Sequence, residues 1–254
     1  MSRLSDIIRR DRTEPLVAEI CSVLRKWNIE PISFQPQVNI QHEGDRPRTM
    51  YLMRSGWIYS YVVLADGQRQ ILFLHQPGDI AGLADFGAER VSCSMRSLGE
   101  CVVLPIPFTA IATLSSTAPD IITYLLQKSA QMQSILMRTL TAVGRMEARP
   151  RVIWLILMLH ERISGSGTTA SAVIEVPFNQ SEIGDLIGLT NVSVSKMLCQ
   201  LSDEGFIERK GSKVLLRRVA DMQAMINYEP MGFLKGSYLN LKEDYRERDA
   251  MKRI

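Results

Sequence analysis

The sequence has few cysteines, few histidines and no long apolar run, and each shortage argues against a class of protein. It holds 4 cysteines and 3 histidines in 254 residues. No two cysteines form a C-x-x-C pair, which argues against a structural zinc site, and we expect no bound metal. Dispersed cysteines in a cytoplasmic protein are typically reduced and buried. No apolar run reaches the length of a membrane span, and the N-terminus lacks the apolar core of a signal peptide. We therefore expect a cytoplasmic protein with no membrane partner.

Sequence motifs of the common enzyme classes are also missing. The chain has no G-x-S-x-G, no phosphate-binding Walker loop and no H-E-x-x-H. The acidic residues Asp79, Asp85 and Glu89 fit loop solvation and turn capping better than an acid and base pair. We therefore expect a protein that is not an enzyme. The net charge of +3 permits nucleic-acid binding but does not argue for it alone.

Short strands dominate the first half of the chain. Apolar or alternating runs between residues 33 and 104 are separated by turn sequences such as Ala65-Asp66-Gly67 and Pro77-Gly78-Asp79. Asp-Gly between two apolar strands is a strong hairpin signal. Many short strands at regular spacing predict a small β-sandwich or jelly roll.

Residues 118–146 have the spacing of one long helix. Apolar and small residues recur at intervals of three and four, close to the inner positions of a coiled coil. A core helix in a monomer is the alternative, but two apolar edges on one helix favour a dimer. The residues that we expect at the dimer interface are Leu125, Met132, Leu136 and Val143.

Residues 178–216 carry the most specific pattern. Asn179 and Glu182 are spaced as a capping box, Gly188 is placed to end a first helix, and Thr190 can cap a second. Two short apolar runs around Lys210-Gly211-Ser212 then predict a two-stranded wing. Two helices joined by a tight turn and followed by a wing are typical of DNA-binding domains. An ordinary helical hairpin in a core is the alternative, and the combined signals favour DNA.

The second helix of this pattern should present its polar face to the major groove. Lys196 is the best candidate for a guanine edge, because lysine can donate to O6 and N7. The expected base contacts are Asn191, Val192, Ser193, Ser195 and Lys196. The expected phosphate contacts are Thr190, Lys210, Lys213, Arg217 and Arg218.

These residues resemble a known family. The run SEIGDLIGLT at 181–190, followed by VSKML at 194–198, is similar to the C-terminal domain of the Crp/Fnr regulators. YLMRSG at 51–56, with Pro77-Gly78-Asp79, follows the order of a cyclic-nucleotide-binding-type β-roll. The resemblance covers residues 16 to 216. It implies an α+β fold: an N-terminal double-stranded β-roll, a long dimerisation helix and a C-terminal winged helix-turn-helix domain.

The resemblance also gives expected boundaries and partners. We expect an N-terminal helix and β-roll sensor domain at 1–117, a dimerisation helix at 118–148, a DNA-binding domain at 149–218 and an extension at 219–254, with the hinge at Arg149-Pro150-Arg151. Members of the family dimerise through the long helix. In the activators a loop corresponding to 164–172 can contact RNA polymerase, which makes the polymerase an expected partner.

The effector pocket that the resemblance implies departs from the family. Cyclic-nucleotide binders use a glutamate for the ribose and an arginine for the phosphate; Leu83 and the pair Val91-Ser92 stand at those places. A buried phosphate without arginine is poorly compensated, so cAMP is not the expected effector. Arg90 lies one residue away. The pocket residues by this alignment are Gly82, Leu83, Arg90 and Ser92.

Iron and haem are not expected either. The iron–sulfur members need an N-terminal cysteine cluster, and only Cys21 lies there. Isolated candidates for haem ligation are His75, Cys93 and Cys101. The leading hypothesis is thus a dimeric, sequence-specific DNA-binding regulator of transcription initiation on an inverted-repeat operator. The alternative is a ligand- or redox-sensing β-roll that acts mainly through protein contacts. A cationic, uncluttered face on the second helix distinguishes the two.

Overall fold

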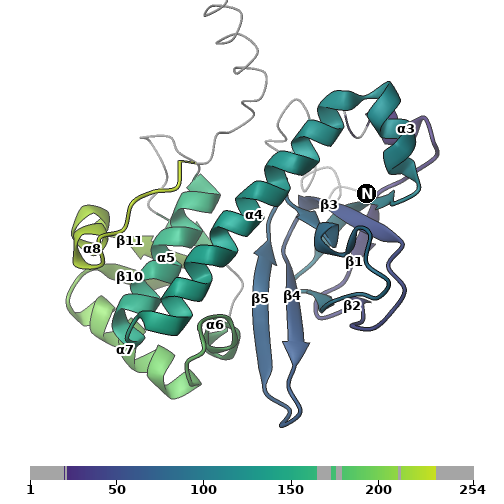
Figure 1. Cartoon of the computed structure of the whole chain (residues 1–254). Coiled ribbons are helices and arrows are strands. Elements are labelled where there is room, and N and C mark those ends of the chain that lie inside the picture. Colours follow the sequence, from purple (N-terminus) through teal and green to yellow (C-terminus); the bar gives the residue numbers. More distant parts are fainter. Residues whose placement is uncertain (1–19, 21, 165–172, 176–178, 211–212, 233–254) are drawn as a thin grey trace, which may run out of the picture. The chain divides into compact units, whose positions relative to one another are not determined.

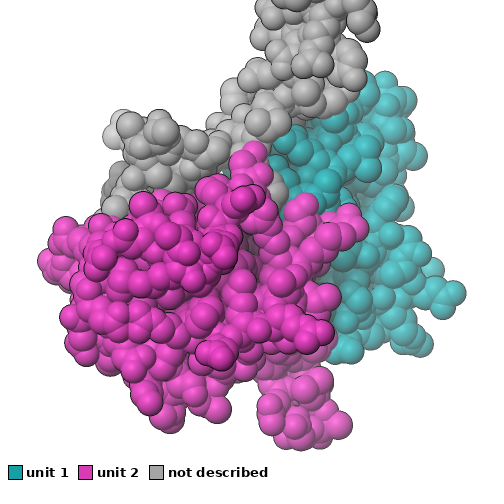
Figure 2. Space-filling view, turned by 60° about the vertical axis from the view of Figure 1, so that its left-hand side comes forward, with its two compact units in different colours: residues 1–58, 75–131, 234–254 teal, residues 59–74, 132–233 magenta. Residues whose placement is uncertain are grey.

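The computed structural model describes residues 20, 22–164, 173–175, 179–210 and 213–232. The chain forms two compact units, coloured separately in Figure 2. Unit 1 is made of residues 1–58, 75–131 and 234–254, and unit 2 of residues 59–74 and 132–233. The basic N-terminal lead-in, the loop 165–172 and the charged tail from 233 lie outside the described residues. Within the described ranges, no helix is long and apolar enough to cross a bilayer.

Two four-stranded sheets form the predicted β-roll (Figure 1). The first has the order β1 (Ile32–Phe34), β8 (Cys101–Pro107), β3 (Thr49–Ser55), β6 (Ile80–Ala81). The second has the order β2 (Asn39–Gln41), β7 (Ser94–Ser97), β4 (Ile58–Val63), β5 (Arg69–His75). The long strands β3 and β8 are antiparallel, with Leu52 opposite Leu104. The β-roll is confirmed; β6 and β7 were not predicted, because one has two residues and the other, SMRS, is largely polar.

The core of unit 1 lies between the first sheet and two helices. α3 (Ala110–Thr117) and α4 (Pro119–Arg145) follow β8. Leu52, Leu104, Ile121 and Leu125 are buried together in one cluster. Leu125 is only 6% exposed. The expectation that Leu125 faces a partner chain is therefore corrected: it packs into the core of its own protomer.

Unit 2 holds the winged domain. α5 (Ala148–Ser164) buries every residue from Val152 to Leu159, so it is the central helix of this domain. α6 (Gln180–Ile187) and α7 (Asn191–Asp203) precede the strands β10 (Ile207–Lys210) and β11 (Lys213–Leu216). β9 (Val173–Glu175), which was not predicted, pairs with β11 to complete a three-stranded sheet. α8 (Val219–Met225) then buries Met222 completely, so the start of the C-terminal extension folds back onto this domain.

The break between α4 and α5 lies earlier than expected. α4 ends at Arg145 and α5 begins at Ala148, so the hinge is at Met146-Glu147. Pro150 lies in the first turn of α5, where its missing N–H costs no helical hydrogen bond. The sequence signal of Pro150 therefore marks the start of a helix, and the hinge placed at Arg149-Pro150-Arg151 is corrected.

Residues 59–74 of the β4–β5 hairpin belong to unit 2, and two of their side chains contact α6. Arg69 Nε donates to Asp185 Oδ2 at 2.7 Å, and Arg69 Nη1 donates to the Tyr59 hydroxyl at 3.0 Å. Gln70 Nε2 donates to the Leu186 carbonyl at 3.2 Å. The hairpin is thus attached to the first helix of the helix-turn-helix by side-chain hydrogen bonds.

Candidate nucleic-acid interface

The capping box predicted at the start of α6 is present. Asn179 Oδ1 accepts a hydrogen bond from the Glu182 backbone N–H at 2.9 Å, and Glu182 Oε2 accepts one from the Asn179 N–H at 3.0 Å. Gly188 ends the helix with φ of 65°, in the left-handed region that favours glycine. These local interactions fix both ends of α6, so the formation of this eight-residue helix depends little on the intrinsic helix propensity of its residues.

The turn between α6 and α7 is set by two further residues. A Cβ on Gly184 would lie 2.4 Å from the Leu189 carbonyl oxygen, so only glycine allows the turn to approach this closely. Arg151 donates from Nη1 to the Ile187 carbonyl at 2.9 Å and from Nη2 to the Met146 carbonyl at 2.6 Å. Arg151 thereby joins the end of α6 to the end of α4 across the hinge, a role that the sequence pattern did not indicate.

α7 is positioned by its cap and by a buried apolar stripe. The Thr190 hydroxyl oxygen accepts from the Ser193 N–H at 3.2 Å, and its hydroxyl donates to Ser193 Oγ at 2.9 Å. Val194, Leu198 and Leu201 are buried. The stripe holds the helix against α5, so the opposite face is left exposed to solvent.

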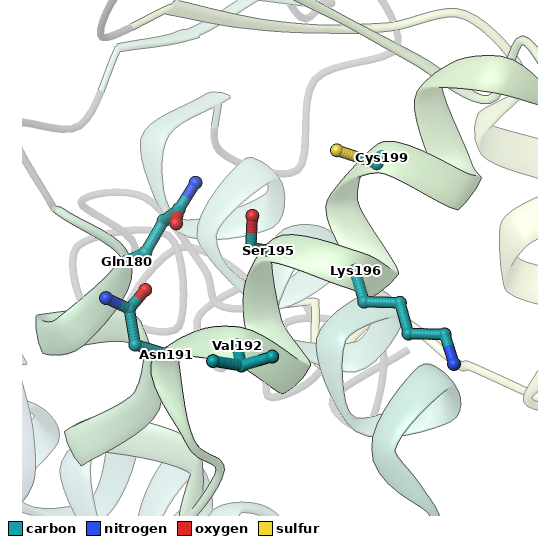
Figure 3. A pocket seen from close by; sticks show the side chains of 6 residues that line it. All are labelled: Gln180, Asn191, Val192, Ser195, Lys196 and Cys199. Atoms are coloured by element: carbon teal, nitrogen blue, oxygen red, sulfur yellow. The ribbon is translucent and has the colours of Figure 1, made fainter.

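That exposed face carries four of the five expected base contacts. Asn191, Val192, Ser195 and Lys196 line a shallow hollow together with Gln180 and Cys199, which the sequence reasoning missed (Figure 3). Val192 is 79% exposed. Lys196 extends away from the helix, and in the described part of the chain it makes no ion pair. Ser193 is not in the lining, because its amide and hydroxyl contact the Thr190 cap.

Several of the expected phosphate contacts are already paired with acids. Glu208 receives Lys210 Nζ at 2.9 Å and also the Arg217 guanidinium. Those two cations, Arg217 first, lower the pKa of Glu208 to about 2. Arg218 pairs with Asp221 at 2.6 Å and stacks over the Phe206 ring at 4.5 Å. Lys213 begins β11 and is exposed.

A second hollow lies beside the first. It is lined by the first residues of α6, by Ile183, by Asn191 of α7 and by Arg209 of the wing strand β10. Gln180 and Asn191 line both hollows, so the two adjoin. Gln180 and Arg209 were not among the expected contacts. Two sequence signals could have indicated these contacts: Gln180 is in the first turn of the first helix, and Arg209 alternates with Glu208 and Lys210 along a strand.

Polar groups at the expected effector position form hydrogen bonds within the β-roll. Asp85 is 2% exposed, and its carboxylate accepts from the Ser92 N–H at 2.9 Å, the Ser92 hydroxyl at 2.6 Å and Gln41 Nε2 at 3.0 Å. Arg90 is exposed and donates to the Gly44 carbonyl at 3.1 Å. Leu83 packs against the apolar core. Gly82 has a φ of 78°, and a Cβ added to it would lie 3.4 Å from the Met95 side chain. The alignment placed these residues near one another, but it missed Asp85.

The cysteines described by the structure are not grouped. Burial raises the pKa of the Cys101 thiol to about 11, so this thiol is protonated at neutral pH. Cys93 is half-buried and Cys199 exposed. Among the residues that the structure describes, no group of three or more histidine, cysteine or acidic side chains is placed to hold a metal ion.

A double-stranded β-roll, a long helix and a winged helix-turn-helix define a class: transcription regulators with a sensor-type domain joined to a DNA-binding domain. A family model described as a cyclic nucleotide-binding domain matches residues 31–117, and one described as a Crp-like helix-turn-helix domain matches residues 150–225. The chain belongs to the Crp/Fnr family of DNA-binding transcription regulators.

Individual relatives agree with this assignment. The chain is 25% identical to electron transport regulator A of Shewanella oneidensis over 173 residues, which are 68% of this chain and 69% of the relative. It is 24% identical to the transcriptional activator protein FnrA of Stutzerimonas stutzeri over 172 residues, 68% of this chain and 70% of the relative. The fold matches FixK2 of Bradyrhizobium japonicum with a TM-score of 0.68 at 22% identity, over 77% of this chain and 96% of that one.

Proposed function

We propose that the protein binds an inverted-repeat operator as a homodimer, through α7 of each protomer, and so regulates transcription initiation. The observation that carries the proposal is the exposed row on α7, where Lys196 stands without an acidic partner in the described chain. Phosphate contacts would supply affinity, and Lys196 and Asn191 would read base edges. The protein acts by binding, in the cytoplasm, with RNA polymerase as its expected partner.

The dimer surface proposed here differs from the one expected from sequence. Apolar side chains on α4 remain exposed at Leu126 (67%), Leu136 (38%), Met137 (60%) and Leu140 (74%). Leu126 and Met137 are eleven residues apart, roughly three helical turns, so they lie on one face with Leu140 one turn further. Val143 instead lies 3.5 Å from the Cβ position of Gly188, at the end of α6. Of the four expected interface residues, Leu136 is among these exposed side chains, and Met132, which is half-buried, stays a prediction.

The effector of this regulator is not proposed to be cAMP. Ser92, which the alignment placed at the phosphate, already donates its N–H and hydroxyl to Asp85. A phosphate brought there would meet a buried carboxylate. Like charges in a poorly solvated site repel strongly, and Arg90 is engaged at the surface.

Selection from a random duplex pool tests the operator. Purified, ligand-free protein is incubated with the pool at two salt concentrations, and the bound fraction is sequenced. We expect a symmetric motif whose half-sites lie about 34 Å, one helical turn, apart. Affinity should fall steeply with salt. Only asymmetric single sites would contradict a dimeric operator, and no binding at either salt would favour the protein-contact alternative.

Substitution of Leu140 by glutamate tests the dimer. A charge on this exposed apolar side chain should not disturb the protomer fold, but it should be excluded from a dry interface. We expect L140E to be monomeric by light scattering and to lose binding to the symmetric duplex. Ala112→Glu, which adds the same charge at an exposed position of α3 outside the proposed interface, is the control. Dimeric L140E would place the interface elsewhere.

A further inference from the structure

We infer that Arg209, on the wing strand β10, is the main phosphate anchor of the wing, and that the paired cations Lys210 and Arg217 contribute less. The inference rests on the proposed DNA-binding function. It assigns a contact that neither the sequence pattern nor the family resemblance indicated.

Strand geometry separates Arg209 from its neighbours. Side chains alternate between the two faces of a β-strand, so Arg209 points to the face opposite Glu208 and Lys210. In the antiparallel pairing Arg209 lies opposite Val214, whereas Lys210 lies opposite Lys213. Arg209 is therefore the cation of β10 that lines the hollow with Asn191 and the first turn of α6.

Charge pairing separates them further. Glu208 holds both Lys210 and Arg217, and its pKa of about 2 keeps it ionised throughout the neutral range. Protonation therefore cannot release these two cations under assay conditions, and a phosphate must compete with the carboxylate for them. Arg209 is exposed and makes no ion pair or side-chain hydrogen bond in the described part of the chain. No acid in the described part of the chain therefore competes with a ligand for the charge of Arg209.

The position of Arg209 fits a phosphate better than a base. The hollow that it lines adjoins the α7 hollow through Gln180 and Asn191, at the N-terminal end of α7. A helix lying in the major groove is flanked by the sugar-phosphate backbones on both sides. Arg209 extends from the wing strand and not from α7, so it meets the flanking backbone.

The test compares Arg209→Gln with Lys210→Gln, neighbours on one strand that differ in face and pairing. Affinity is measured by fluorescence anisotropy across a salt series, on the duplex enriched by selection and on a duplex of mixed sequence. Loss of one phosphate contact reduces the slope of log affinity against log salt by about 0.9. We expect that loss for R209Q, with a fall in affinity of about five-fold on both duplexes, and less than about two-fold for K210Q.

Two further variants make the result decisive. Arg209→Lys should retain the salt slope, because a phosphate needs only the charge, whereas a guanine contact needs the bidentate guanidinium. Glu208→Gln should raise affinity by releasing Lys210 and Arg217. The inference is overturned if K210Q loses the slope and R209Q keeps it, or if R209Q changes preference at a single base pair. A selection in which wild-type protein retains no duplex at either salt concentration would instead refute the DNA-binding function itself.

Discussion

The polar groups of α7 and those of the β-roll effector position are held in opposite ways. On α7, Lys196 and Asn191 are exposed and project from a helix whose other face is buried. In the β-roll, Asp85 is buried and accepts three hydrogen bonds from Ser92 and Gln41. Polar groups without partners in the protein can bind a ligand, whereas groups that satisfy one another stabilise the fold. The difference fits the proposal that α7 binds DNA and that the β-roll residues do not bind the phosphate of a cyclic nucleotide.

The largest expected effect comes from adding a side chain at Gly184, where α6 closely approaches the turn before α7. Gly184→Ala would bring a Cβ to 2.4 Å from the Leu189 carbonyl oxygen, a backbone atom of the turn. We expect the free energy of unfolding to fall by about 3 kcal/mol, measured by denaturant titration, with loss of specific DNA binding. Gly99→Ala is the control, since nothing lies within 4 Å of its Cβ position. Wild-type stability in G184A would mean that the turn can shift, and that the α7 face does not depend on it.

The next effect comes from breaking the internal pairing in the β-roll. Asp85→Ala removes the acceptor for three hydrogen bonds from Ser92 and Gln41. Donors left without a partner cost about 1–3 kcal/mol, so we expect the free energy of unfolding to fall by about 2 kcal/mol. DNA affinity, measured well below the unfolding transition, should be unchanged. Glu89→Ala removes an exposed acid nearby and should have little effect; equal losses in both variants would refute the pairing argument.

The smallest effect on stability, with a clear effect on binding, is expected at Lys196. Lys196→Ala removes an exposed side chain, so the free energy of unfolding should change by less than about 0.5 kcal/mol. Affinity for the selected duplex should fall about ten-fold, and one base position in each half-site should lose its preference. Lys26→Ala, an exposed lysine of unit 1, is the control. If K196A weakens binding equally on all sequences, Lys196 contacts phosphate and does not read a base.

Local signals predicted the frame of the DNA-binding surface. The Asn179–Glu182 capping box, the left-handed Gly188 and the Thr190 cap are interactions within four residues, and all three are confirmed. The β-roll was also predicted, except for its strands β6 and β7, and β9 of the winged domain was not predicted. Those strands are short, and pairing with distant segments stabilises them, which no local pattern records.

Long-range pairing was beyond the reach of the pattern. Nothing in the spacing of the wing showed that Glu208 would hold both Lys210 and Arg217, or that Arg209 would point the other way into a hollow with α6. The helical period of α4 predicted two apolar edges but did not show which one faces the core. Leu125 was therefore predicted to contact a partner chain, whereas it packs against the β-roll of its own protomer.

The amino-acid sequence by itself determined the order of the elements, their caps and turns, and the family to which the chain belongs. These depend on periodicity and on contacts between residues a few positions apart. The tertiary structure alone decided which wing cations pair with acids, which side chains hydrogen-bond to the Asp85 carboxylate and which apolar side chains of α4 remain exposed. Those outcomes depend on groups that are distant in sequence and come into contact only after folding. Burial and hydrogen bonding in the folded state then determine the free energy of each polar side chain.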